Sequence, residues 1–322
     1  MNLPDSSPSR GRHSRFHIPG VPYHIISKTI RGNFLLVPKE HTLEVTTGVV
    51  GKAQENWPNV ELHGFAFLSN HFHLMVSGDS REISLFVGFI KREISRRLGQ
   101  EYNFDGAFWH SRFTSTGLPT PDSQVDCLRY ILSQGVKEDL VARPQDWPGL
   151  HCVRALLAGK PITGSWFQGT EYGIAKRNQQ RSSNKRAVKK IDYYYTVTIK
   201  LTPIPPWSHL SKEDQRQLAR EMVQSIVDEA AERRKKRGIR VVGRKAVMRM
   251  SIFTRVAPPP PPWWEDRRRQ ITAWAKLGDP LTQKFLRLYW GFQKAFRAAS
   301  ECLKSGEEAN FPKGAWLPAH YA

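Results

Sequence analysis

Hydrophobic and polar positions in the first half of the chain follow two different periods. Runs rich in β-branched and aromatic residues, bounded by Gly, Pro and Asn, predict strands, and apolar residues at helical spacing predict helices. The predicted strands cover residues 23–30, 60–67, 68–76 and 104–113, and the predicted helices cover 41–56, 83–98 and 122–134. The order is strand, helix, strand hairpin, helix, strand, helix. It predicts an α+β fold with a ferredoxin-like antiparallel sheet and one further helix.

The second arm of the predicted hairpin carries the run Leu68-Ser69-Asn70-His71-Phe72-His73-Leu74-Met75-Val76. Successive strand side chains point to opposite faces, so His71 and His73 share one face and Phe72 takes the other. Two imidazoles on one face of a strand can hold a metal ion. The motif alone leaves open a second interpretation, two partly buried histidines with hydrogen-bond partners. Asn70 either orients a ligand histidine or forms the turn.

The last helix of this half has Val125, Leu128 and Leu132 as its apolar stripe. Tyr130 and Gln134 project roughly opposite that stripe, and because they are four residues apart they lie one above the other. Such a pair is common on helix surfaces, so it acquires meaning only together with the histidines.

The chain is 322 residues long with a formal charge of +20, and the charge is unevenly distributed. Residues 1–165 carry a net charge of +3, whereas residues 166–322 carry +17. A basic excess of this size attracts polyphosphates through counterion release. We predict a domain at 1–165, a basic linker at 166–192, and a mostly helical basic accessory domain at 193–322 that binds DNA.

Basic residues at several places are candidate DNA contacts, although a solvated basic surface is the alternative for each. The cluster 233–237 ends a predicted helix that begins after Ser211, where basic residues also suit the helix dipole. The candidates are Arg12, Arg15, Lys91, Arg92, Arg96, Arg112, Arg233, Arg234, Lys235, Lys236 and Arg237.

The rest of the second half shows a strand-like run at 193–199 and a last helix with Phe285, Leu288, Phe292 and Phe296 at core spacing. Pro258 to Pro262 and the tryptophans that follow are an alternative docking surface for a protein partner. Nothing in this half looks catalytic.

Cysteine usage and apolar runs bear on location. Cys127, Cys152 and Cys302 have neither metal spacing nor a disulfide pattern, which suits a reducing cytoplasm. The N-terminus lacks the apolar segment of a secretion signal, and no apolar run is long enough to span a bilayer. We predict a cytoplasmic protein without a membrane partner.

Taken together, these motifs resemble those of single-tyrosine transposases of the IS200/IS605-like group, and in particular the REP-associated tyrosine transposases. The resemblance covers about residues 10–165. It rests on Ser69 to Val76 as the His-hydrophobic-His motif and on Leu128 to Gln134 as the nucleophile helix, with support from Tyr23 to Ser27, Phe108 to Phe113 and Leu140 to Pro148. REP-associated members typically have Asn-Pro after the tyrosine helix. This chain has Gln134-Gly135, and the IS200/IS605 enzymes use glutamine as the ligand there.

The resemblance implies the core of an HUH endonuclease in which His71, His73 and Gln134 bind Mg²⁺ or Mn²⁺. It implies that Tyr130 attacks single-stranded DNA at hairpin-marked sites and forms a 5′-phosphotyrosine, so that a second 3′-hydroxyl can reseal the strand. His24, His63 and His110 are interpreted as packed residues, or as residues that support a ligand, rather than as ligands themselves. The DNA partner places the protein at the nucleoid.

Two alternatives stay open. One is a domesticated transposase that binds hairpin DNA without cutting it and acts as a targeting or regulatory partner. The other concerns partners beyond DNA, namely a homodimer or a protein bound through the C-terminal domain.

Overall fold

The structure, a computed structural model, describes residues 13–181, 187–255, 272–274 and 278–316. Two sequence features named above therefore lie outside the described residues. They are Arg12 and the run Pro258 to Pro262 with the tryptophans after it.

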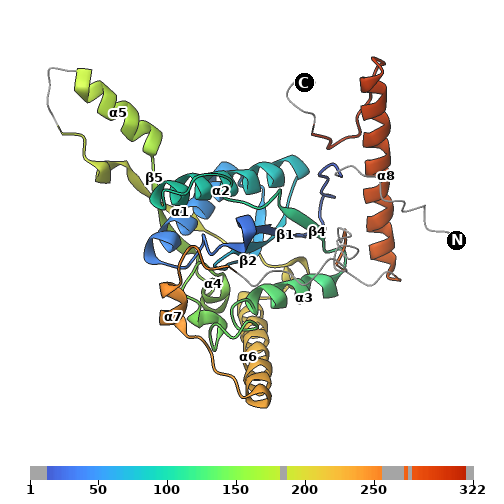
Figure 1. Cartoon of the computed structure of the whole chain (residues 1–322). Helices are drawn as coiled ribbons and strands as arrows, with labels where there is room; N and C mark the ends of the chain where they lie inside the picture. Colours follow the sequence, from blue (N-terminus) through green and yellow to red (C-terminus); the bar gives the residue numbers. More distant parts are fainter. Residues whose placement is uncertain (1–12, 182–186, 256–271, 275–277, 317–322) are drawn as a thin grey trace.

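A four-stranded antiparallel sheet forms the centre of the N-terminal half (Figure 1). Its strands are β1 (Tyr23–Lys28), β2 (Glu61–Phe67), β3 (His71–Ser77) and β4 (Thr114–Gly117), in the spatial order β2-β3-β1-β4. This order, with crossing helices between β1 and β2 and between β3 and β4, is that of a ferredoxin-like fold. The predicted α+β class is confirmed.

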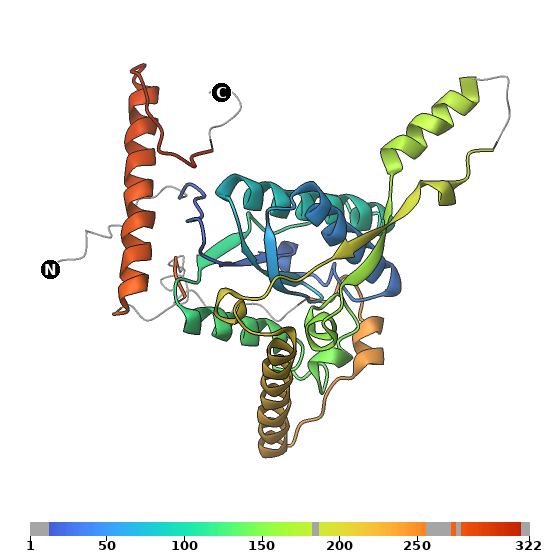
Figure 2. The ribbon, with the colours of Figure 1, turned by 180° about the vertical axis from the view of Figure 1, so that it is seen from behind.

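Helices cover both faces of this sheet. α1 (Glu40–Asn56) and α2 (Ser80–Glu101) pack together on one face, and α3 (Pro121–Leu132) lies on the other (Figures 1 and 2). The stripe predicted for α2 is buried, because Ile83, Phe86 and Ile90 are all inaccessible to solvent. The sheet residues with the same orientation as His71 and His73 therefore face α3.

The fourth strand is where the sequence interpretation was wrong. The prediction placed it at 104–113, but that segment is an irregular loop and β4 begins at Thr114. Positive φ angles of 46° at Asn103 and 98° at Gly106 break the extended backbone. Phe108 and Phe113 are buried as loop residues rather than as sheet residues. The aromatic residues of 104–113 therefore indicate burial rather than a strand. The edge strand that pairs with β1 is the short polar run that follows them.

A two-stranded ribbon joins the two halves of the chain. β5 (Ile162–Phe167) pairs antiparallel with β6 (Tyr194–Ile199), which confirms the strand predicted near 193–199. The ribbon packs on α1 where Gly48 and Gly51 leave room, and it extends outward to α5 (Gly169–Arg181) as a projecting arm (Figure 1). β5 and α5 were not predicted. α5 lies inside the segment predicted as a linker, and the division into domains stays a prediction.

The remaining helices surround the core. α6 follows the predicted cap Ser211, whose side chain accepts from Asp214 N, and it ends at Gly238 with φ 64°. These helices are α4 (Val153–Ala158), α6 (Lys212–Arg237), α7 (Arg244–Arg249) and α8 (Pro280–Lys304), with short 3-10 turns at Ile30–Gly32, Pro144–Asp146, Lys190–Tyr193 and Pro205–Trp207. The predicted C-terminal helical region is confirmed.

α8 lies beside β4 and the first described residues of the chain (Figure 2). Phe285 and Phe292 are buried there as predicted, but Leu288 is 49% exposed. The contact face is set by Phe285, Tyr289 and Phe292, and their spacing leaves Leu288 to one side.

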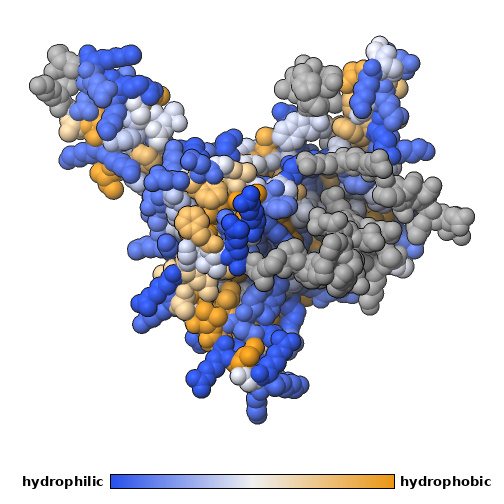
Figure 3. Space-filling model, viewed as in Figure 1, coloured by the Kyte–Doolittle hydropathy of each residue, from blue (hydrophilic) through white to orange (hydrophobic). Residues whose placement is uncertain are grey.

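Hydrophilic residues dominate the parts that project from the core. In the space-filling view they cover most of the arm and the free end of α6 (Figure 3). Within the described residues, no helix is both long and apolar enough to cross a membrane.

Candidate active site

Two histidines on the central sheet form the base of the site. β3 pairs with β1 on one side and β2 on the other, with His71 opposite Lys28 and His73 opposite Ile26. Their ring centroids are 4.8 Å apart. His73 is 2% exposed and His71 is partly exposed, so both imidazoles are held on a buried strand beneath α3.

The partners of these rings leave one nitrogen of each available. Asn70 Oδ1 lies 2.6 Å from His71 Nδ1, and because an amide oxygen only accepts, Nδ1 carries the hydrogen and Nε2 keeps its lone pair. His73 Nδ1 lies 2.9 Å from His24 Nε2. His73 Nε2 is buried and has no hydrogen-bond partner among the described residues. A histidine with one nitrogen held and the other free is the arrangement of a metal ligand.

α3 brings Tyr130 over the histidines, and the turn that follows the helix carries Gln134. Thr120 caps the helix through a capping box with Ser123, which fixes where the helix begins. The Tyr130 ring lies 5.4 Å from that of His73 and 5.8 Å from that of His24, measured between centroids. From the sequence, only the residue spacing along the helix suggested that Tyr130 faces the histidines of the sheet. The structure places the Tyr130 ring beside them.

Gln134 lies in the turn just after α3. Its Nε2 donates to the Tyr130 carbonyl at 2.8 Å, which points its Oε1 elsewhere. That oxygen is buried and, like His73 Nε2, has no hydrogen-bond partner in the described part of the chain. Gln134 also lies close to His71, and its amide partly opposes the fall in the pKa of His71 that burial causes.

The donor set fits a divalent cation. The two imidazole rings lie side by side, and among the described residues His73 Nε2 and Gln134 Oε1 are buried without a hydrogen-bond partner, which is costly for a polar atom. Across the described residues, no group of three or more His, Cys, Asp or Glu side chains is arranged to hold a metal ion. The Gln134 amide stays the predicted third ligand beside the two histidines.

Burial keeps the imidazoles neutral. It lowers the pKa of His24 and of His71 to about 4, and it holds the pKa of His73 well below its usual value. Burial is the largest cause for all three residues. The positive charge of Lys137 lowers each pKa further, and for His71 and His73 other neighbouring charges act more strongly than Lys137. Neutral imidazole is the form that binds a metal ion.

Two residues of the site were missed by the sequence interpretation. Lys137 Nζ lies 3.7 Å from the Tyr130 ring centroid, and it also pairs with Glu138 at 3.5 Å. Trp274 contacts the same ring with a centroid distance of 5.4 Å, and it lies 5.5 Å from His24. Its backbone bonds to Gly117 at the end of β4, which brings this distant part of the chain to the site.

The other predicted packed histidines differ from one another. His63 is buried and its ring bonds to Ser77 Oγ and to two backbone carbonyls, so it is a packed residue as predicted. His110 is exposed, so the prediction that it is packed was wrong, and its backbone N–H donates to Lys28 O.

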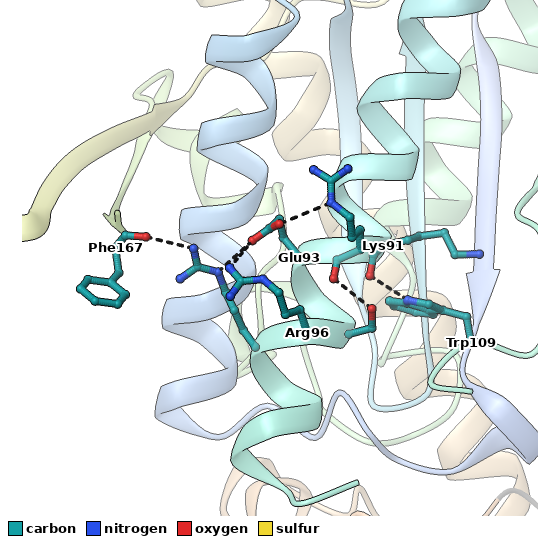
Figure 4. A network of polar contacts seen from close by, with 8 residues as sticks. Lys91, Glu93, Arg96, Trp109 and Phe167 are labelled. Carbon is teal, nitrogen blue, oxygen red and sulfur yellow. Dashed lines mark hydrogen bonds and ion pairs between the residues drawn. The ribbon is translucent and has the colours of Figure 1, made fainter. Parts of the chain in front are cut away.

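The predicted DNA contacts occupy separate places in the fold. Arg15 lies over the Phe113 ring at 3.6 Å and shares a pocket with Arg112. On α2, Lys91 Nζ donates to Ser111 O at 2.7 Å, and the Lys91 carbonyl accepts from Trp109 Nε1 (Figure 4). At the end of α6, Lys235, Lys236 and Arg237 are exposed.

Some of these cations are already paired with carboxylates. Arg92 and Arg96 converge with Arg97 on Glu93, and Arg97 also donates to Phe167 O at the root of the arm (Figure 4). Arg233 and Arg234 both pair with Asp139, at 2.9 and 3.6 Å. All eleven residues stay predictions as DNA contacts.

Comparison with known proteins gives one family match. Residues 18–134 match the family model described as "Transposase IS200 like". No curated protein matches the sequence.

Two similar solved structures cover part of the chain. The structure of the REP-associated tyrosine transposase bound to a REP hairpin is 20% identical, with a TM-score of 0.39, and the match covers 46% of this chain and 86% of that one. A putative transposase from Deinococcus radiodurans R1 is 16% identical, with a TM-score of 0.27 and coverage of 38% and 98%.

Proposed function

We propose that this protein, whose residues 18–134 match the IS200-like transposase family model, cleaves and rejoins single-stranded DNA through Tyr130. The observation that carries the proposal is the placement of the Tyr130 ring 5.4 Å from His73, with Gln134 one turn further on. The substrates are single strands that carry a hairpin, and the protein acts at the nucleoid.

The chemical step is a transesterification. The Tyr130 oxygen attacks the scissile phosphorus, the bond from phosphorus to the 3′ oxygen breaks, and the strand ends are a 5′-phosphotyrosine and a 3′-hydroxyl. The phenol proton is released to solvent, and the departing 3′ oxygen takes one up. Resealing reverses the step with another 3′-hydroxyl, so that no nucleotide cofactor is needed.

His71, His73 and Gln134 are the residues that would hold Mg²⁺ or Mn²⁺. Such an ion polarises the scissile phosphate and offsets its charge. Asn70 and His24 orient the two imidazoles through their Nδ1 atoms, which would leave the Nε2 atoms to bind the ion. Lys137 and Trp274 contact the Tyr130 ring and restrict its orientation.

The test is covalent capture of DNA. A hairpin oligonucleotide labelled at its 3′ end is incubated with the full chain and Mg²⁺ or Mn²⁺ and then run on a denaturing gel. We expect a labelled protein–DNA adduct that Tyr130→Phe abolishes while DNA binding persists. Tyr172→Phe, on the arm, is the matched control and should keep the adduct. An adduct undiminished in Tyr130→Phe would contradict the proposal.

The second candidate function is hairpin DNA binding without cleavage. The observations that favour it are the Gln134-Gly135 pair in place of the Asn-Pro of REP-associated members and the net charge of +17 in residues 166–322. Binding without an adduct across several divalent metals and hairpin sequences would support this candidate over the first.

A further inference from the structure

A basic pocket lies away from the histidines, between α8, the first described residues and the loop before β4. Its volume is about 580 Å³. Arg15 and Arg112 line it from the core, and Arg297 and Lys304 line it from α8. It is therefore formed by residues from both ends of the chain.

The wall between α8 and the N-terminal residues is a packed interface. The rings of Phe16 and Phe292 stack with centroids 3.9 Å apart. Gln293, which is 5% exposed, accepts from Ser14 N at 3.0 Å and donates to Ser14 O at 2.8 Å. These contacts fix the position of the α8 cations relative to Arg15.

The charge of the pocket is one-sided. Among the described residues that line it, four are Arg or Lys and none is Asp or Glu. Burial and the neighbouring Arg112 lower the pKa of Arg15 to about 10, and burial together with the charge of Arg297 lowers the pKa of His13. Cations that repel one another in a partly buried site favour an anion between them.

The pocket also offers an aromatic surface. Trp316 lines it and is 46% exposed, and Phe296 lines it from α8. Cations beside an exposed aromatic ring are the combination that holds a nucleotide of a single strand, with phosphate on the cations and base on the ring.

We propose that this pocket binds a nucleotide of the single-stranded DNA substrate, with its phosphate held by Arg15, Arg297 and Lys304 and its base stacked on Trp316. The inference rests on the proposed function in that it takes the ligand to be the DNA substrate. It gives the C-terminal helix a direct part in holding the strand, on the β4 side of the sheet.

The first test compares charge removal on two faces of α8. Arg297→Gln/Lys304→Gln removes two pocket cations, and Lys284→Gln/Arg287→Gln removes two exposed cations that lie off the pocket face. Binding to a hairpin oligonucleotide with a single-stranded extension is measured against salt, in the full chain carrying Tyr130→Phe. We expect the pocket pair to weaken binding about tenfold and to reduce the salt slope by about 0.7 per lost phosphate contact. Equal affinity and slope in the two pairs would overturn the proposal.

The second test separates stacking from charge. Trp316→Ala should weaken binding about tenfold without changing the salt slope, and Trp316→Phe should restore most of the affinity. Equal thermal unfolding temperatures would show that the variants fold. Unchanged affinity in Trp316→Ala would rule out base stacking at this site.

The adduct assay distinguishes this inference from the proposed cleavage. If the chain with Tyr130 intact forms the adduct but the pocket pair binds like its control, the pocket proposal fails alone. If no adduct forms and the pocket pair still loses affinity, the cleavage proposal fails and the pocket proposal stands.

Discussion

At the scale of single residues, the site is defined by which nitrogen of each histidine is occupied. The alternation of strand side chains was enough to place His71 and His73 on one face, but Gln134 lies in the turn after α3 rather than on the helix, and its side chain bonds to the Tyr130 carbonyl. The hydrogen bonds that set the ring orientation could not be predicted, because Asn70 was equally consistent with forming only a turn. In the structure the Asn70 side chain contacts His71 Nδ1, and its backbone carbonyl accepts from Thr29 Oγ1.

Asn70→Ala should weaken metal binding. The substitution removes the acceptor 2.6 Å from His71 Nδ1, so the ring loses the bond that fixes its orientation. We expect the affinity for Mn²⁺ to fall about 10- to 100-fold, measured by calorimetry on the full chain. Asn70→Asp keeps an acceptor and should retain most of the affinity. An unchanged affinity in Asn70→Ala would show that this bond does not support the site.

Two buried histidines outside the site make stability depend on pH. Burial lowers the pKa of His17 and of His151 to about 4, against about 6.5 in the unfolded chain. The unfolded state therefore binds protons more readily between these values, and stability is full above pH 6.5 and falls as the pH drops towards 4. Each histidine should contribute about 3 kcal/mol to that loss.

His151→Asn tests this pH dependence. Asparagine can accept from Val153 N in place of His151 Nδ1, so the local turn is kept. The slope of the unfolding free energy against pH, measured by urea denaturation between pH 4.5 and 6, should decrease by about one proton. A slope equal to that of the unchanged chain would contradict the assignment.

At the scale of elements, the ribbon β5–β6 shows what local sequence could not reveal. Its two strands are separated by α5, so neither the pairing nor the contact with α1 follows from any nearby pattern. In contrast, α2 was predicted from its apolar stripe, because that stripe is continuous along the chain. β4 was misplaced because buried aromatic residues preceded the paired strand.

Gly48→Ala should loosen the ribbon. A Cβ at Gly48 would collide with the carbonyl oxygen of Ser165 in β5, and backbone cannot easily retreat. We expect a loss of about 1–3 kcal/mol in unfolding free energy. Gly88→Ala is the matched control, since Gly88 is also helical but has nothing within 4 Å of its added Cβ, and it should gain about 0.5–1 kcal/mol. Equal effects from the two substitutions would show that the ribbon adapts.

At the scale of the whole molecule, the uneven charge predicted a basic second half, but sequence could not distinguish free cations from paired ones. The end of α6 shows the difference. Arg233 and Arg234 are held by Asp139, which is 15% exposed, whereas Lys235, Lys236 and Arg237 are exposed. We therefore expect the exposed three to provide most of any DNA contact from this cluster.

Two sets of substitutions test this separation. Changing Lys235, Lys236 and Arg237 to Gln should weaken binding of single-stranded DNA and lower the salt slope by about 2, with little change in stability. Changing Arg233 and Arg234 to Gln leaves Asp139 unpaired and should cost about 1–3 kcal/mol of unfolding free energy. The assignment is wrong if the exposed set affects stability and the paired set affects only DNA affinity.

Gly117 at the end of β4 contacts both the segment 272–274 and helix α8. Its N–H donates to Thr272 O and its carbonyl accepts from Trp274 N, while the Phe285 ring of α8 fills the space where a side chain would stand. A displacement of α8 would therefore also change the position of the Trp274 indole beside Tyr130. If DNA bound in the pocket beside α8 changes the affinity of the histidines for a metal ion, thermodynamic reciprocity requires that the metal ion change the affinity of the pocket for DNA by the same factor. The contacts of Gly117 would then set the size of the coupling between the α8 pocket and the histidine site.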